Sequence, residues 1–313
     1  MKKITVFGSF MVDNVASMDR YPEAGETVVG KSLQIFLGGK GANQCIALGR
    51  QNANVRMIGM VGNDANGQKF IDLFKKENID VSNVFVTDKN CTGTAQIQIN
   101  KNGQNRICVI PCANHEFLDE QFEKVKPVLK DSDYVICQLE MDIETTFKVI
   151  EYCKQNNVKV ILNPAPAIKL PDYILKNLDY LMPNETELAL ISNLDTSDIN
   201  QIKIAAKALF DKGVKHVVTT LGSKGAFIFD ENGARIVSSY HVDAIDTVAA
   251  GDSFIGAFAY SLSEGCSIED AVKYGNAMGA LTVQVKGAIP SLHHKEEVEQ
   301  FIKENNPLET INL

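Results

Sequence analysis

The sequence lacks the cysteine and histidine spacings that form disulfide frameworks or metal sites. Its seven cysteines are odd in number and scattered, without any C-x-x-C pair, and its five histidines show no spacing typical of metal ligands. A disulfide framework and a zinc site are therefore not expected. The pattern indicates a reducing compartment, in which we expect most of the cysteines to serve as small core residues.

The chain also lacks a long hydrophobic segment and an excess of basic residues. No run approaches the ~18 apolar residues that a membrane-spanning helix needs, and the apolar stretch near Met1 is too short for a signal peptide. The formal net charge of −8 argues against nucleic acid or an anionic membrane as the main partner. We therefore expect a cytoplasmic protein that could still bind a nucleotide through local amide groups and single lysines.

What the sequence does contain is an alternation of strand-like and helix-like segments. Its hydrophobic content of 45% and charged content of 22% are typical of a globular protein. Helix-periodic segments, such as 67–77, 143–156 and 199–212, separate most of the apolar strand-like runs, which are 3–7, 55–61, 134–137, 159–162, 180–182 and 216–220. This order predicts a doubly wound α/β core with a mostly parallel sheet, whose ligands gather at the carboxyl ends of the strands.

Two stretches interrupt this alternation. Residues 93–110 alternate on both sides of Asn102-Gly103, a strong hairpin signal, and residues 27–37 alternate loosely like a pair of strands. We expect them to form a small antiparallel β lid, inserted at about 14–37 and 91–111 into a single domain that spans residues 1–313. A sheet with one apolar face needs a cover, so the lid should close over a ligand or pair with another subunit.

The most informative motif is Asp246-Thr-Val-Ala-Ala-Gly-Asp252, which precedes an apolar helix-like stretch. The backbone N–H groups of Ala249, Ala250 and Gly251 can converge at the start of this helix, where anions bind. Asp252 would repel such an anion, so we expect its carboxylate to accept a proton. A base beside an anion hole predicts phosphoryl transfer to a hydroxyl. The alternative is an ordinary helix start with an aspartate in its first turn, which the helix dipole also favours.

A second glycine-rich motif, Gly38-Gly39-Lys40-Gly41-Ala42-Asn43-Gln44, opens a helix that runs to about Arg50. It matches neither a Walker A loop nor the dinucleotide-binding fingerprint in context. The glycines let a ligand approach the backbone, Lys40 supplies a cation, and Asn43 supplies both a donor and an acceptor. This chemistry suits a polyhydroxylated small molecule. The alternative is a tight turn with a solvated lysine.

Further candidates follow other predicted strands. Asp13 comes just after the first strand and could accept hydrogen bonds from paired sugar hydroxyls. Glu140 follows an apolar strand and is either a ligand contact or an ordinary surface residue at a strand end. Asn184 and Glu187 lie one helical turn apart, so they could orient a magnesium-bound water or a phosphate. The alternative for this pair is helix capping with a solvated acid.

In combination, these motifs resemble a known family. Residues 38–44 and 246–252 are similar to the two signatures of the ribokinase-like carbohydrate kinases, the PfkB family. Segments 139–140, 163–167, 183–187 and 220–225 look like the ribokinase branch, in order and at family spacing over essentially the whole chain. The resemblance implies a three-layer α/β/α core with a mostly parallel sheet and a β lid that often forms a homodimer. It also implies ATP-dependent phosphorylation of the 5-hydroxyl of a pentose, D-ribose.

The resemblance implies a role for each matching residue. Asp252 would be the catalytic base, and Ala249, Ala250 and Gly251 would form the anion hole. The sugar would be surrounded by Met11, Asp13, Gly39, Lys40, Asn43, Glu140 and Asp252. The ATP site would comprise Asn184, Thr220, Gly222, Ser223, Gly225, Gly251 and Asn276, with Mg²⁺ held through water on Glu187. A K⁺ ion would bind, mostly through backbone oxygens, at Asp246, Val248, Thr282, Val285, Gly287 and Ser291.

Met11 departs from the pattern, because many bacterial ribokinases have asparagine there. A thioether cannot donate a hydrogen bond to a 2-hydroxyl, and it packs well against a 2-methylene. Deoxyribokinases look similar at this point, although some ribokinases also carry methionine. The sequence leaves both a 2-deoxy-D-ribose kinase and a packing role for Met11 open. A sugar or nucleotide sensor without activity is an alternative from another class, against which the intact Asp252 motif counts.

Overall fold

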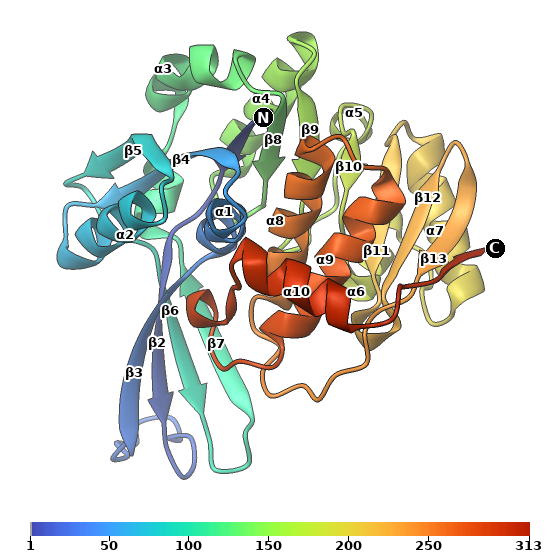
Figure 1. Ribbon diagram of the computed structural model, residues 1–313. Coiled ribbons are helices and arrows are strands. Elements are labelled where there is room, and N and C mark those ends of the chain that lie inside the picture. Colours follow the sequence, from blue (N-terminus) through green and yellow to red (C-terminus); the bar gives the residue numbers. More distant parts are fainter. Residues whose placement is uncertain (1) are drawn as a thin grey trace.

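The computed structural model describes residues 2–313, in which helices cover both faces of a central sheet and a smaller sheet projects from one end (Figure 1). The central sheet has ten strands in the order β14-β13-β12-β11-β10-β9-β8-β1-β4-β5. Seven strands of this sheet, β11, β10, β9, β8, β1, β4 and β5, are parallel to one another, and β12, β13 and β14 extend one edge in antiparallel pairing. The bounds are β1 (Lys3–Phe7), β4 (Asn54–Gly62), β5 (Asp80–Thr87), β8 (Tyr134–Cys137), β9 (Lys159–Leu162), β10 (Tyr180–Leu181), β11 (His216–Thr220), β12 (Ala226–Asp230), β13 (Gly233–Val237) and β14 (Thr310–Asn312).

The helices form the two outer layers. One layer packs on the face to which Ile4 and Val6 point, and it contains α1 (Lys40–Arg50), α2 (Ala65–Lys76), α8 (Ala250–Ser263), α9 (Ile268–Thr282) and α10 (Lys295–Glu304). The other packs around Phe7, and it contains α3 (Asp119–Lys130), α4 (Ile143–Gln155), α5 (Asp172–Leu175), α6 (Glu185–Ser192) and α7 (Ile199–Asp211). Residues of β1 therefore serve two separate cores, which explains why Ile4, Val6 and Phe7 are all apolar and fully buried. The predicted three-layer α/β/α fold with a mostly parallel sheet is confirmed.

The smaller sheet is the predicted lid. It has four strands in the order β3-β2-β6-β7, namely β3 (Ser32–Gly38), β2 (Met11–Ser17), β6 (Thr94–Ile99) and β7 (Asn105–Ile110). The outer pairs are antiparallel, and the central pair, β2 with β6, is parallel. The hairpin predicted over 93–110 is present as β6 and β7. Figure 1 shows this sheet standing away from the core, connected to it at one end.

Two sequence-based expectations were wrong in detail. Residues 27–37 do not form a pair of strands: only β3 lies there, and its partner is β2, so the lid begins at Met11 and not near residue 14. The polar residues of β2 hid its strand character. Most cysteines are not core residues either, because only Cys45, Cys137 and Cys153 are buried. Within residues 2–313, no helix has both the length and the apolar character that crossing a membrane requires.

Candidate active site

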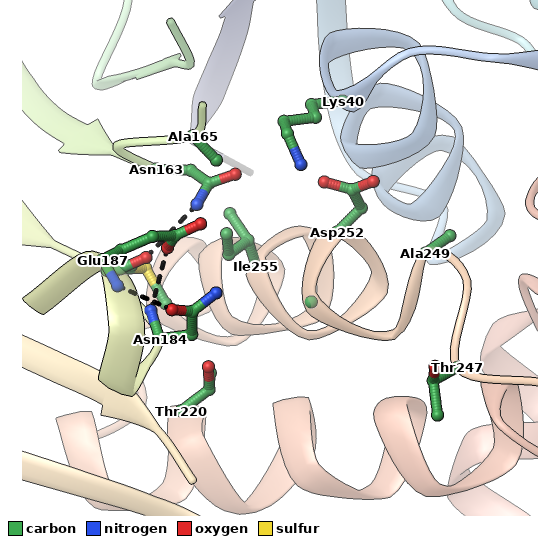
Figure 2. Close-up of a pocket in the computed structure, with 12 residues that line it drawn as sticks. Lys40, Asn163, Ala165, Asn184, Glu187, Thr220, Thr247, Ala249, Asp252 and Ile255 are labelled. Atoms are coloured by element: carbon green, nitrogen blue, oxygen red, sulfur yellow. Dashed lines mark hydrogen bonds between the residues drawn. The ribbon is translucent and has the colours of Figure 1, made fainter. Parts of the chain in front are cut away.

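A pocket of about 230 Å³ lies where β9, β10 and β11 end and α8 begins. This is the edge at which parallel sheets bind ligands. Figure 2 shows Lys40 and Asp252 facing one another across one side of the pocket, with Asn184, Glu187 and Thr220 on the other. The lining residues are Lys40, Asn163, Ala165, Met182, Asn184, Glu187, Thr220, Thr247, Ala249, Gly251, Asp252 and Ile255.

The start of α8 forms one wall. Ala249 caps the helix with a φ of 62°, a left-handed conformation that costs an alanine ~1–2 kcal/mol. Among the predicted anion-hole amides, the N–H of Ala250 donates to the Thr247 carbonyl oxygen at 3.3 Å. The N–H of Gly251 has no acceptor among residues 2–313, and Gly251 lines the pocket. The helix therefore presents at least one free donor to a ligand, which suits an anion.

Asp252 lies in the first turn of α8 and is fixed by two side chains of α1. Its Oδ2 accepts a hydrogen bond from Asn43 Nδ2 and its Oδ1 accepts one from Gln44 Nε2, both at 2.9 Å. The helices approach closely because Gly256 has no side chain: a Cβ there would lie 2.6 Å from Ala47 Cβ. Close packing of α1 on α8 thus brings the two glycine-rich motifs together and orients the Asp252 carboxylate.

A buried network of amides extends behind Asp252, and three of its residues were missed by the sequence analysis as site residues. Gln44 Oε1 accepts a hydrogen bond from Gln138 Nε2 at 2.6 Å, and Gln44 Nε2 also donates to Asn163 Oδ1 at 3.1 Å. Gln138 and Asn163 each follow a strand end, a position that could have revealed them. The buried Asn43 Oδ1 has no partner within residues 2–313, as expected for a group that meets a ligand.

The other predicted sugar-side residues also converge. Glu140 Oε2 accepts hydrogen bonds from the Ser9 hydroxyl and, at 3.0 Å, from the Lys40 backbone N–H. Burial raises the pKa of Glu140, and burial together with the Glu140 charge raises the pKa of Asp13 to about 6. Burial alone would lower the pKa of Lys40, but the carboxylates of Asp252, Glu140 and Glu187 outweigh it and raise that pKa. These groups therefore form one interacting cluster of charges.

Gly39 and Met11 lie at the junction of this cluster with the lid. Gly39 has a φ of 93°, and a Cβ there would lie 2.8 Å from the Met11 backbone nitrogen, so only glycine fits. Met11 is 3% exposed, and its sulfur lies 3.8 Å from Asn114 Nδ2. Its side chain is therefore packed against Asn114, at the root of the lid.

Asn184 and Glu187 form a reciprocal helix cap at the start of α6. Asn184 Oδ1 accepts from the Glu187 N–H at 2.8 Å, and Glu187 Oε2 accepts from the Asn184 N–H at 2.9 Å. The capping alternative is thus present, and both residues line the pocket as well. Burial raises the pKa of Glu187.

The remaining ATP-side candidates lie around the end of β11. Thr220 lines the pocket, whereas Gly222, Ser223, Gly225 and Asn276 do not. Asn276 Nδ2 donates to the Ser238 carbonyl at 2.9 Å and thereby ties α9 to the segment after β13. The loop 222–225 is a single 3₁₀ turn that ends at Gly225 with a φ of 103°.

The predicted potassium ligands are only partly brought together. Asp246 Oδ2 accepts from the Gly287 N–H at 2.9 Å and Oδ1 from the Val248 N–H at 3.1 Å. The hydroxyls of Thr282 and Ser291 donate to nearby backbone carbonyls. The Thr282 carbonyl accepts from the Val285 N–H at 3.2 Å. Within residues 2–313, no cluster of three or more His, Cys, Asp or Glu side chains is suited to a metal.

The chain is similar to known carbohydrate kinases over nearly its whole length. The profile of the pfkB family carbohydrate kinases matches residues 1–295. The ribokinase of Haemophilus influenzae is 36% identical over 96% of this chain and 99% of its own length, and that of Staphylococcus aureus is 38% identical over 95% and 99%. The deoxyribokinase of Salmonella typhi is 34% identical over 96% and 99%.

Solved structures agree with these relatives. The Arabidopsis thaliana ribokinase complexed with ribose and ATP superimposes with a TM-score of 0.90 at 30% identity, covering 96% of this chain and 99% of that one. The Thermotoga maritima ribokinase gives a TM-score of 0.88 at 35% identity, covering 97% and 100%. The glycine-rich motifs that meet at Asp252 are thus set in a shared fold, and the chain belongs to the pfkB family of carbohydrate kinases.

Proposed function

We propose that this protein transfers the γ-phosphoryl group of ATP to the 5-hydroxyl of D-ribose, giving ribose 5-phosphate and ADP. The observation that carries the proposal is the Asp252 carboxylate, buried at a helix N-terminus and oriented by Asn43 and Gln44 beside Lys40. The similarity to ribokinases of two bacteria over nearly the full chain supports ribose as the sugar.

In this proposal, the protein supplies a base, a clamp and an anion hole. Asp252 accepts the proton of the 5-hydroxyl. At the same time, the hydroxyl oxygen bonds to the γ-phosphorus, and the bond between the γ-phosphorus and the ADP oxygen breaks. The free N–H at Gly251, with those of Ala249 and Ala250, stabilises charge on the transferred group. Asp13, Gly39, Lys40, Asn43 and Glu140 hold the sugar, and Asn184, Thr220, Gly222, Ser223, Gly225 and Asn276 lie on the ATP side.

A divalent cation is part of this proposal. Mg²⁺ is normally held through water and substrate phosphates with few protein ligands, so one pocket carboxylate besides the base Asp252 is enough to bind it. Glu187 is that carboxylate: one oxygen is used in the helix cap, which leaves the other for a metal-bound water. When bound, the metal neutralises charge on the phosphates.

A monovalent cation belongs to the same proposal. We assign K⁺ to Asp246 and to the backbone oxygens of Val248, Thr282, Val285, Gly287 and Ser291, because one carboxylate among neutral carbonyls suits a large, weakly charged ion. Asp246 already fastens Val248 and Gly287 together just before α8. A bound ion would therefore order the loop that leads into the anion hole.

The wider organisation is also proposed here. We propose a single domain with an inserted lid, a cytoplasmic location, and a homodimer formed through the lid. Support for the dimer comes from the exposed apolar side chains of Leu33, Ile35, Ile107 and Val109 on the lid strands.

Deoxyribose is the second candidate substrate, and Met11 is the residue that raises it. The contact of its sulfur with Asn114 and its 3% exposure support a packing role, and hence ribose. A site with its polar partners intact rejects a missing hydroxyl by up to ~10⁴–10⁵. If Met11 determines specificity, Met11→Asn would increase the preference for ribose over 2-deoxy-D-ribose. If it only packs, the ratio of the two kcat/KM values will not change.

The proposal is tested by ATP-dependent ADP release with D-ribose and 2-deoxy-D-ribose side by side, in K⁺ and then in Na⁺. We expect ribose to be preferred and K⁺ to increase turnover. Asp252→Asn should abolish turnover but retain ATP binding, whereas the surface substitution Asp211→Asn should have no effect. Near-native kcat in Asp252→Asn would remove the base assignment, and no turnover with either sugar would favour a sensor.

A further inference from the structure

Two cysteines meet at the root of the lid. The Sγ atoms of Cys91 and Cys112, 21 positions apart in the sequence, lie 3.4 Å apart. Cys91 precedes β6 and Cys112 follows β7, just beyond the last cross-strand pair of that hairpin, Thr94 with Ile110. Cys91 and Cys112 therefore flank the two ends of the hairpin that join the core. Figure 1 shows β6 and β7 projecting together from the core.

Each side of the thiol pair is anchored to the core by a neighbouring residue. On the first side, the Thr92 N–H donates to Asp64 Oδ2 at 2.7 Å and its hydroxyl donates to Asp64 Oδ1 at 2.9 Å. On the other, Asn114 accepts from the Phe10 N–H at 2.9 Å and donates to the Phe10 carbonyl at 2.8 Å. The Ala113 N–H also donates to the Cys91 carbonyl at 3.0 Å. The contact between the sulfurs is thus built into the fold.

The two thiols differ in accessibility to solvent. Cys91 is exposed to solvent, whereas Cys112 is partly buried. Burial, together with the neighbouring Cys91 and Asp64, raises the pKa of the Cys112 thiol to about 11. Because the thiolate is the reactive form, Cys112 is a weak nucleophile at neutral pH. An external reagent therefore reaches Cys91 first, and Cys112 is placed to react second.

We propose that Cys91 and Cys112 are a redox modification site that forms a reversible intramolecular disulfide with low-molecular-weight disulfides such as oxidised glutathione. Cys91 loses its proton to solvent, and its thiolate attacks one sulfur of the reagent, whose S–S bond breaks and releases one thiolate. Cys112 then loses its proton to solvent and attacks Cys91 Sγ, expelling the second thiolate. The released thiolates take up protons, so two protein thiols are oxidised and one disulfide is reduced to two thiols.

The geometry requires little movement. The sulfurs need to approach from 3.4 Å to the ~2.05 Å of a disulfide. The resulting bridge would link the two ends of the β6–β7 hairpin beside solvent. Exposed bridges are the ones that cellular thiols reduce readily, so a reducing compartment would keep this one transient.

The test uses the full-length protein, reduced, freed of reductant and then treated with oxidised glutathione. We expect the intact mass to fall by two hydrogens, and a peptide map without reduction to contain Cys91 joined to Cys112. A reducing agent should restore the original mass. In the bridged protein, the Tm should be higher than in the reduced protein, because the cross-link restricts the unfolded chain.

Matched variants make the outcome specific. Cys108→Ser removes an exposed thiol on β7 of the same hairpin and should still give the bridge and the rise in Tm. Cys112→Ser should give neither and should retain glutathione on Cys91. Three results would each overturn the proposal for the protein without substitutions: glutathione that stays on Cys91, a bridge between other cysteines, or thiols that do not react. Because the mass readout needs no turnover, it is independent of the proposed kinase activity.

Discussion

At the scale of single residues, the site depends on how Asp252 is oriented. Both carboxylate oxygens accept hydrogen bonds from neighbouring residues of α1, and one of these, Gln44, is itself oriented by Gln138. All of these side chains are at most 8% exposed, so water cannot easily replace a lost partner. Gln44 therefore acts as a positioning residue, through Asp252 and without a place among the pocket-lining residues.

This arrangement predicts the effect of Gln44→Ala. We expect kcat to fall about 10- to 100-fold, because small misplacements of reacting groups have costs of that size. The KM for ATP should change little. Steady-state kinetics with both substrates measures the effects on kcat and on KM separately. Gln44→Glu should lower kcat more than Gln44→Ala does, because it places a second carboxylate against Asp252. Equal losses in stability and activity, without a selective fall in kcat, would indicate a structural role only.

Asp13 predicts a pH dependence. Its pKa of about 6 means that the carboxylate becomes protonated below that pH and can no longer accept two hydrogen bonds from the sugar. We expect kcat/KM for the sugar to fall as the pH drops below about 6, since this ratio reports groups of the free enzyme. Asp13→Asn should lower kcat/KM at all pH values and abolish its fall at low pH. If kcat/KM of the variant still falls at low pH, another group is responsible for the pH dependence.

The raised pKa of Asp13 also affects stability, and in the opposite direction: activity should increase as Asp13 ionises, whereas stability should decrease. The folded pKa of Asp13 lies above the ordinary value of 3.8, so the folded protein binds the proton more tightly than the unfolded chain does. Ionisation of Asp13 therefore lowers the free energy of unfolding as the pH rises from about 4 to about 6. We expect Asp13→Asn to raise the Tm at pH 7, and a lower Tm would contradict this account.

Short motifs in the sequence singled out residues that the structure brings into contact. Asn43 and Asp252 each stand in a recognisable run, and the structure brings them into contact. The positions of Gln138 and Asn163 after strand ends mark them as candidates, but their hydrogen bonds with Gln44 could not be predicted in this way, because they meet Gln44 only after β8, β9 and α1 have packed together. A buried amide network is a property of three elements, and no single segment records it.

At the scale of elements, the close approach of α1 to α8 sets the geometry of the site. Gly256 on α8 has no space for a side chain, whereas a Cβ at Gly279 on α9 would meet only an ordinary contact at 3.7 Å. We expect Gly256→Ala to destabilise the protein by about 1–3 kcal/mol through overpacking, and to lower kcat by displacing Asp252.

Gly279→Ala provides the matched control, since the same change in a helix without crowding should leave stability equal or higher. Denaturant unfolding of both variants measures the difference in the free energy of unfolding. Equal stability of the two variants would show that α8 can move away from α1 without loss.

Elements were predictable from sequence when they were buried on both faces. The strands expected at 134–137, 159–162 and 216–220 match β8, β9 and β11 at both ends. β5, β13 and β14 were not predicted; they lie at or near the edges of the sheet, where the apolar pattern is interrupted or short. β12 was also not predicted, although it is buried throughout and apolar except for Asp230, and it is the exception to this rule. β2 was missed because Asp13, Asn14 and Ser17 interrupt its hydrophobic alternation.

At the scale of the whole molecule, the lid predicts an assembly. Its strand β7 is exposed throughout, and Ile107 and Val109 are about half exposed there. We expect light scattering to give the mass of a homodimer, and Ile107→Glu to give a monomer, because a buried charge without a partner disfavours association. Lys101→Glu, at the exposed hairpin turn, is the control and should leave the mass unchanged. A monomeric unmodified protein would remove the dimer proposal.

The order of the strands in the sheet could not be predicted from sequence, even for the strands that were themselves predicted. The first strand of the chain, β1, lies in the middle of the sheet between β4 and β8. Loop lengths and apolar patterns do not specify which strands become neighbours, so only the general α/β class followed from the alternation.

The central place of β1 has a consequence for the protein while it is being made. Synthesis starts at the N-terminus, yet β1 gains its second neighbour only when Tyr134–Cys137 has left the ribosome. Until then, an apolar strand has one open edge, and such edges attract other chains. Nascent chains that end between β4 and β8 therefore leave this edge of β1 open, and slow translation over that interval would prolong its exposure.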